Sequence, residues 1–165
     1  SMSRMYSLKG FTKTFNVLLK NKHMSVEYRN DLAIGSICGI TALMNSGDGP
    51  TNGFAYYLGV KHNVPHGLAG AIFLKEVMNF NIDKKYKAYE QLIPSMNLVE
   101  LMDNFENLYK NLNIPNLSNY GFTLNDMDNF VNESTNALSG SFSGNPVEFD
   151  KDSVKIVYKN LIMEN

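Results

Sequence analysis

The spacing of apolar side chains most constrains this fold, because they recur every three to four residues along most of the chain. Between residues 98 and 108 they mark one face of a helix, which ends before Pro115. The clearest case is the final stretch, whose apolar residues follow the spacing i, i+3, i+4, i+7 and i+8: Val154, Val157, Tyr158, Leu161 and Ile162.

Strands facing water on one side need an alternation of apolar and polar residues, and no run of useful length alternates here. The best strand candidate, residues 71–74, lies inside a longer helical pattern over residues 67–80. The sequence therefore predicts an all-α fold, a single domain of about seven or eight helices.

Several expected helices carry recognisable start signals. Ser25 can cap a long helix that runs to about Met44, and Asp150 can cap the final helix. Thr123 and Asp126 have the spacing of a capping box. The polar stretch 139–146 is typical of a loop leading to the last helix, and without a preceding strand it cannot be a dinucleotide-binding phosphate loop.

Two glycines interrupt the long helix that Ser25 begins. Each of Gly35 and Gly39 should cost about 1 kcal/mol relative to alanine. We expect a close crossing with a second helix, because such a crossing requires small residues.

Composition excludes several classes of protein. Fifteen Lys and Arg against 16 Asp and Glu give a net charge of −1, so no electrostatic feature favours nucleic acid or an anionic membrane. No apolar run is long enough to span a bilayer. The lone cysteine, Cys38, excludes an internal disulfide and is expected to be a small buried apolar residue. We expect a cytoplasmic protein, with residues 1–6 an expression remnant and extension and residues 7–165 the helical domain.

The segment 49–67 is the most informative for function. Pro50 suits the first turn of a helix and Gly59 its end, and His66 should begin the next helix. A histidine at a helix N-terminus favours the neutral imidazole that a metal requires. His62 lies four residues earlier, across an expected loop. From the residues alone, a histidine lining a helix junction is favoured over a metal ligand.

The segment resembles the signature of the iron-containing alcohol dehydrogenase family, which has a dehydroquinate synthase-like fold. The apolar helix that follows, the Gly-Asn-Pro at 144–146 and the helix before the signature are also similar, so the resemblance runs from about residue 7 to the end. Six residues match the signature in register: Gly49, Leu58, Gly59, Pro65, His66 and Gly67.

The resemblance implies the C-terminal helical domain of an NAD(P)-dependent oxidoreductase for a small-molecule alcohol or aldehyde. The N-terminal nucleotide-binding domain is expected to be absent and the chain inactive by itself. Dehydroquinate synthase-like and glycerol dehydrogenase-like branches fit less well, because they usually have Glu where this chain has Leu68.

Family members hold iron or zinc with one Asp and three His. His66 matches the last of these ligands, Asn52 occupies the position of the first signature His, and Tyr56 that of a pocket-lining His. The earlier Asp-x-x-x-His pattern has no counterpart here. The resemblance thus places His66 and Asn52 at metal positions and Tyr56 and His62 at catalytic positions, with all four in one cleft.

We expect no metal and no NAD(P) to bind this chain alone, because one imidazole and one amide are too weak a ligand set. Two alternatives stay open: a non-catalytic helical scaffold or binding module, and a metal-independent reductase with Tyr56 or His66 as proton donor. Apolar surface left without a partner domain allows for a homo-oligomer.

Overall fold

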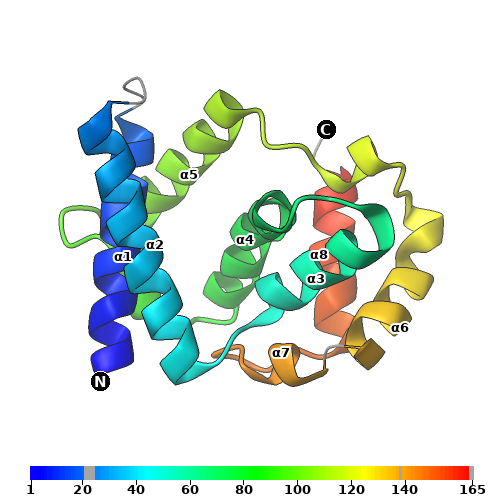
Figure 1. Cartoon of the computed structure of the whole chain (residues 1–165). Helices are drawn as coiled ribbons and strands as arrows, with labels where there is room; N and C mark the ends of the chain where they lie inside the picture. The colour runs from blue at the N-terminus through cyan, green and yellow to red at the C-terminus, as the bar shows by residue number, and fades with distance from the viewer. Residues whose placement is uncertain (21–24, 138, 164–165) are drawn as a thin grey trace. The chain divides into compact units, whose positions relative to one another are not determined.

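The computed structural model describes residues 1–20, 25–137 and 139–163, and within these ranges it is helical with no strand (Figure 1). The predicted all-α class is confirmed. The α-helices in these ranges are α1 (Met2–Leu19), α2 (Val26–Ser46), α3 (Pro50–His62), α4 (His66–Asp83), α5 (Leu98–Leu112), α6 (Met127–Ala137), α7 (Ser139–Ser143) and α8 (Lys151–Met163). Three short 3-10 turns join them: η1 (Ala88–Gln91), η2 (Leu117–Tyr120) and η3 (Leu124–Asp126).

The chain divides into two compact units. One consists of Ser1–Gly47 and Lys87–Leu112, and the other of Asp48–Tyr86 and Asn113–Asn165. The first therefore holds α1, α2 and α5, and the second holds the remaining α-helices.

In the first unit, α1 and α2 cross closely at glycines. A Cβ atom added to Gly10 would lie 2.9 Å from the Gly35 carbonyl oxygen and 3.0 Å from the Gly39 nitrogen. A Cβ on Gly35 would overlap the Thr14 hydroxyl. The predicted close crossing is confirmed, with Gly10 as the partner that the sequence did not single out. Cys38 is buried beside it, as expected.

An aromatic core holds the second unit together. Phe54, which is fully buried on α3, stacks on Phe73 of α4 with ring centroids 4.4 Å apart, and Phe130 of α6 packs beside both. Tyr158 of α8 is also fully buried, and its hydroxyl donates to the Thr123 carbonyl at 2.7 Å. The buried hydroxyl of Tyr158 therefore has a hydrogen-bond partner, as a polar group in a core requires.

The helix starts follow the predicted caps. The Ser25 hydroxyl accepts from the Tyr28 backbone N–H at 3.1 Å, and Asp150 accepts from the Ser153 N–H at 2.9 Å. Thr123 and Asp126 form the expected reciprocal capping box. Each interaction spans three residues, so local sequence is sufficient to specify it.

Two predictions about helix ends were wrong. Gly59 does not end α3, which continues to His62 and is capped by Asn63 in the left-handed conformation at φ 54°. Asparagine tolerates that conformation, and the turn brings the Val64 carbonyl over Gly59. The expected loop 139–146 instead begins with the short helix α7.

No helix in the described part of the chain is long and apolar enough to cross a membrane.

Candidate functional site

The junction of α3 and α4 brings together two of the residues that the sequence singled out. The rings of Tyr56 and His66 meet edge to face, with centroids 5.2 Å apart and planes at 69°. Both side chains are exposed. Asn52 lies four residues before Tyr56 on α3, and residues with that spacing share a helix face. The structure therefore provides an exposed phenol and imidazole in contact, with an amide one turn away.

Asn52 has a partner that sequence reasoning missed. Its side-chain amide donates to Oδ2 of Asp48 at 2.5 Å, and the Ser141 hydroxyl donates to the same oxygen at 2.8 Å. The hydrogen bond from Asn52 is the main reason that the pKa of Asp48 lies below its ordinary value of 3.8; burial opposes it and Ser141 reinforces it. Asp48 is therefore a carboxylate at neutral pH. Its spacing of four from Asn52 was visible in the sequence, but nothing there pointed to Ser141.

His62 belongs to a different cluster. Its ring packs on Phe122 at 4.6 Å and lies 5.8 Å from Tyr57. The Tyr57 hydroxyl donates to Oε2 of Glu133 at 3.1 Å. Burial, followed by the nearby charge of Glu133, raises the pKa of Tyr57 to about 12. The ring contacts of His62 are thus with Phe122 and Tyr57, whereas that of His66 is with Tyr56.

The residues present do not fit an iron or zinc centre. Within the described ranges, no group of three or more His, Cys, Asp or Glu side chains lies close enough together to hold a metal ion. The Asn52 amide nitrogen faces Asp48, so Asn52 could offer a metal only its neutral carbonyl oxygen. Structural and catalytic sites for these metals use three or four imidazole, thiolate or carboxylate ligands.

The segment that joins α7 to α8 is anchored at two points. A Cβ on Gly144 would overlap the carbonyl oxygen of Asp48, so only glycine allows this approach. The amides of Asn145 and the buried Asn81 bind each other, and Asn145 also donates to the Val147 carbonyl. Gly144 and Asn145 of the Gly-Asn-Pro sequence are therefore both explained by packing and hydrogen bonding within this chain.

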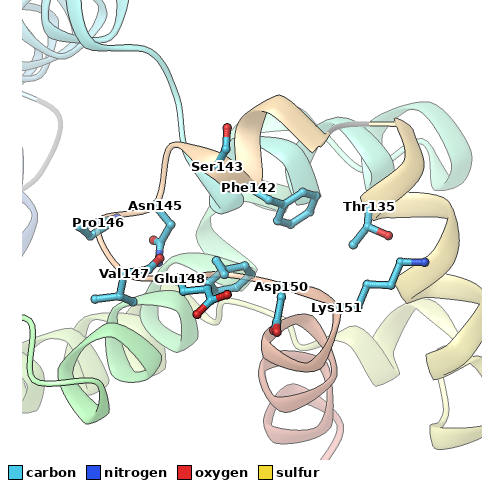
Figure 2. A pocket seen from close by; sticks show the side chains of 10 residues that line it. Thr135, Phe142, Ser143, Asn145, Pro146, Val147, Glu148, Asp150 and Lys151 are labelled. Atoms are coloured by element: carbon cyan, nitrogen blue, oxygen red, sulfur yellow. The ribbon is translucent and has the colours of Figure 1, made fainter.

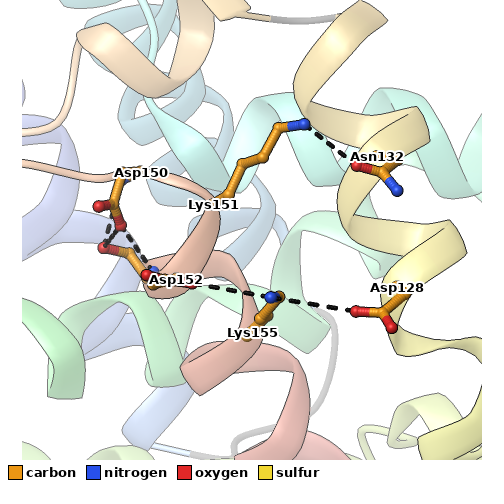
Figure 3. Close-up of polar contacts among 7 residues, drawn as sticks. Asp128, Asn132, Asp150, Lys151, Asp152 and Lys155 are labelled. Carbon is orange, nitrogen blue, oxygen red and sulfur yellow. Dashed lines mark hydrogen bonds and ion pairs between the residues drawn. The ribbon is translucent and has the colours of Figure 1, made fainter.

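A cavity of about 590 Å³ lies between α6, α7 and the start of α8 (Figure 2). Phe142, Phe149 and Val147 line it. Nearby polar contacts join α6 to α8 (Figure 3). Lys151 donates to Asn132 at 3.0 Å, and the Lys155 ammonium lies between Asp128 and Asp152. Lys151, which lines the cavity, therefore already has a protein partner.

Comparison with known proteins identifies the family to which the chain is similar. The model of the Fe-containing alcohol dehydrogenase family, C-terminal, matches residues 6–162. An NADPH-dependent butanol dehydrogenase from Clostridium saccharobutylicum is 29% identical over 154 residues, which are 86% of this chain and 40% of that protein. A lactaldehyde reductase from Escherichia coli K12 is 36% identical over 62 residues, 38% of this chain and 16% of that protein.

Solved structures show the same fold. A 1,3-propanediol oxidoreductase matches with a TM-score of 0.82 at 17% identity, over 96% of this chain and 45% of that one. An archaeal alcohol dehydrogenase from a Red Sea brine pool matches with a TM-score of 0.81 at 18% identity, over 96% and 44%. The chain thus spans less than half the length of these relatives. Since the family model covers nearly all of it, the chain belongs to the Fe-containing alcohol dehydrogenase family and corresponds to its C-terminal part.

Proposed function

We propose that the full-length protein is an NAD(P)-dependent oxidoreductase that interconverts a small alcohol and its aldehyde. Residues 1–165 are its helical part and are inactive alone. The family match over residues 6–162 is the observation that carries this proposal. The relatives named for butanol and for lactaldehyde suggest a short-chain substrate. The nucleotide would be bound by the part of the protein that these relatives have beyond the matched region.

Within this chain we assign the polar contacts with substrate to Tyr56 and His66. They touch each other and are exposed, so a ligand could reach both. A phenol or an imidazole can donate a hydrogen bond or proton to a carbonyl oxygen as an alcohol forms. We assign no such role to His62, because its ring packs on Phe122. We propose no metal for this proton transfer, because the donor set does not fit one.

The decisive experiment uses the full-length parent protein. NADH or NADPH oxidation at 340 nm would be followed with butanal, lactaldehyde and related short aldehydes, with and without added Fe²⁺ or Zn²⁺. We expect turnover by the full-length protein and none by residues 1–165. A Tyr56→Phe or His66→Ala variant with full reductase activity would reject the role given to that residue.

A second candidate function is a non-catalytic helical scaffold or binding module. The specific observation in its favour is that the Asn52 amide is already bound to Asp48 at the position of a family metal ligand. Failure of the folded full-length protein to oxidise either nucleotide with any aldehyde, with or without metal, would support this function and contradict the enzyme.

A further inference from the structure

We infer that Asp48, Asn52 and Ser141 form a metal-free clasp, which fastens the start of α3 to α7 at the helix position where the family pattern places a metal ligand. The inference does not depend on the proposed activity. It concerns how this part of the second unit is held together. All three residues belong to that unit, so the clasp does not depend on the first.

The geometry of the clasp is that of a charge-assisted pair of hydrogen bonds. One carboxylate oxygen of Asp48 accepts from the Asn52 amide at 2.5 Å and from the Ser141 hydroxyl at 2.8 Å. Hydrogen bonds to an ionised acceptor are shorter and about twice as strong as neutral ones. Ser141 is 9% exposed and Asp48 and Asn52 are half-buried, so water competes only in part for these groups. The clasp joins positions 93 residues apart along the chain.

Backbone packing supports the same junction independently of the side chains. The carbonyl oxygen of Asp48 lies against Gly144, where a side chain would overlap it. The next residue, Asn145, is fixed to the buried Asn81 of α4. The segment after α7 is therefore held at Asp48 on one side and at α4 on the other.

The clasp also explains why Asn52 suits this position without a metal. A carboxylate can only accept hydrogen bonds, so the Asn52 NH₂ group must face Asp48. A histidine ligand would instead have to turn a bare nitrogen toward the cation. In this chain the side chain at position 52 is used to connect two helices, and a cation is not needed to do so.

The first test is NMR of uniformly ¹⁵N-labelled residues 1–165. Exchange of the Asn52 side-chain amide protons with water is compared with that of Asn129, which is exposed on α6. We expect exchange at least about tenfold slower at Asn52, which corresponds to the lower end of the range for a hydrogen bond to a charged group. Asp48→Ala should abolish the difference. Equal exchange rates for Asn52 and Asn129 in the folded wild-type chain would overturn the clasp.

The second test addresses the metal. Thermal unfolding of the wild-type chain is recorded with EDTA, with Zn²⁺ and, without oxygen, with Fe²⁺, and bound metal is measured by mass spectrometry. We expect no bound metal and no shift in Tm, because only a ligand that binds the native state raises it. A stoichiometric metal with a raised Tm, both lost in Asn52→Ala, would contradict the inference.

The variants also report on the clasp directly. Asn52→Ala should lower Tm more than the matched exposed change Asn129→Ala. If Asn52→Ala does not fold, Ser141→Ala keeps the test available, since it removes one donor and leaves the other in place. That variant should lower Tm while the Asn52 amide still exchanges slowly; a Tm equal to that of the wild type would contradict the part given to Ser141.

Discussion

Asn145 and Asn81 bind each other through both ends of their side-chain amides. The Asn145 amide donates to Asn81 Oδ1 at 2.7 Å, and the Asn81 amide donates back to Asn145 Oδ1 at 3.1 Å. Asn81 is only 1% exposed, so water cannot replace its partner. This pair fixes the segment before α8 to α4, and the segment in turn carries Gly144 to its contact with Asp48.

Replacing Asn81 with alanine should lower the free energy of unfolding by about 1 to 3 kcal/mol, because the variant removes both hydrogen bonds of the amide pair and leaves Asn145 bound only to the Val147 carbonyl. Urea denaturation followed by circular dichroism measures this change. The exposed Asn129→Ala serves as the control and should cost less than about 0.5 kcal/mol. Similar losses in the two variants would contradict a special role for the amide pair.

The crossing of α1 and α2 predicts opposite effects at two glycines. Gly10→Ala should destabilise the chain by about 1 to 3 kcal/mol, because its Cβ would press on the backbone of Gly35 and Gly39. Gly39→Ala should stabilise it by up to about 1 kcal/mol, since its Cβ would meet nothing within 4 Å and alanine favours the helix. The same urea measurements compare them. A Gly10→Ala variant with an unchanged free energy of unfolding would show that the two helices can move apart without cost.

The two buried phenols, Tyr57 and Tyr158, should ionise only at strongly alkaline pH. Burial is the main cause that raises the pKa of Tyr57 and of Tyr158 from 10.0 to about 12. A raised folded-state pKa gives stability that is fully present below pH 10 and is lost as pH rises through about 12. Absorbance at 295 nm should therefore show a late phase to which Tyr57 and Tyr158 contribute, preceding or accompanying unfolding.

Tyr57→Phe tests the assignment of that late phase. It should remove one late-titrating phenol and cost about 1 kcal/mol, the net value of its hydrogen bond to Glu133. A wild-type chain without a late phase would contradict both assignments.

The outer face of α2 predicts self-association of the chain. Three of its exposed apolar residues follow the three-four spacing of a helix-packing seam: Ile37, Ile40 and Met44. Apolar surface of this kind favours association, and we propose a homo-oligomer through it. Analytical ultracentrifugation over a concentration series measures the oligomer.

The double variant Ile37→Lys with Ile40→Glu should shift the chain to the monomer. Ile156→Lys, at a partly exposed position on α8, is the control and should leave association unchanged. A wild-type chain that stays monomeric at every concentration would rule out this interface.

The sequence by itself determined the features that depend on near neighbours. Apolar spacing was sufficient for the helical class, and Ser25, Asp150 and Thr123 were recognisable as caps because their hydrogen bonds reach only three residues. The two glycines of α2 indicated a close crossing but not Gly10 as its partner. Gly59 was misjudged because a helix end depends on which residue adopts the left-handed conformation, and here Asn63 does.

Only the tertiary structure decided what surrounds the candidate site. The pattern placed Asn52 at a metal position, yet its side chain is bound to Asp48, and Ser141 completes that contact from 93 residues away. It also grouped His62 with His66, whereas their rings pack on Phe122 and on Tyr56. Hydrogen bonds and ring contacts between distant segments depend on how the helices pack, and a linear pattern does not contain that information.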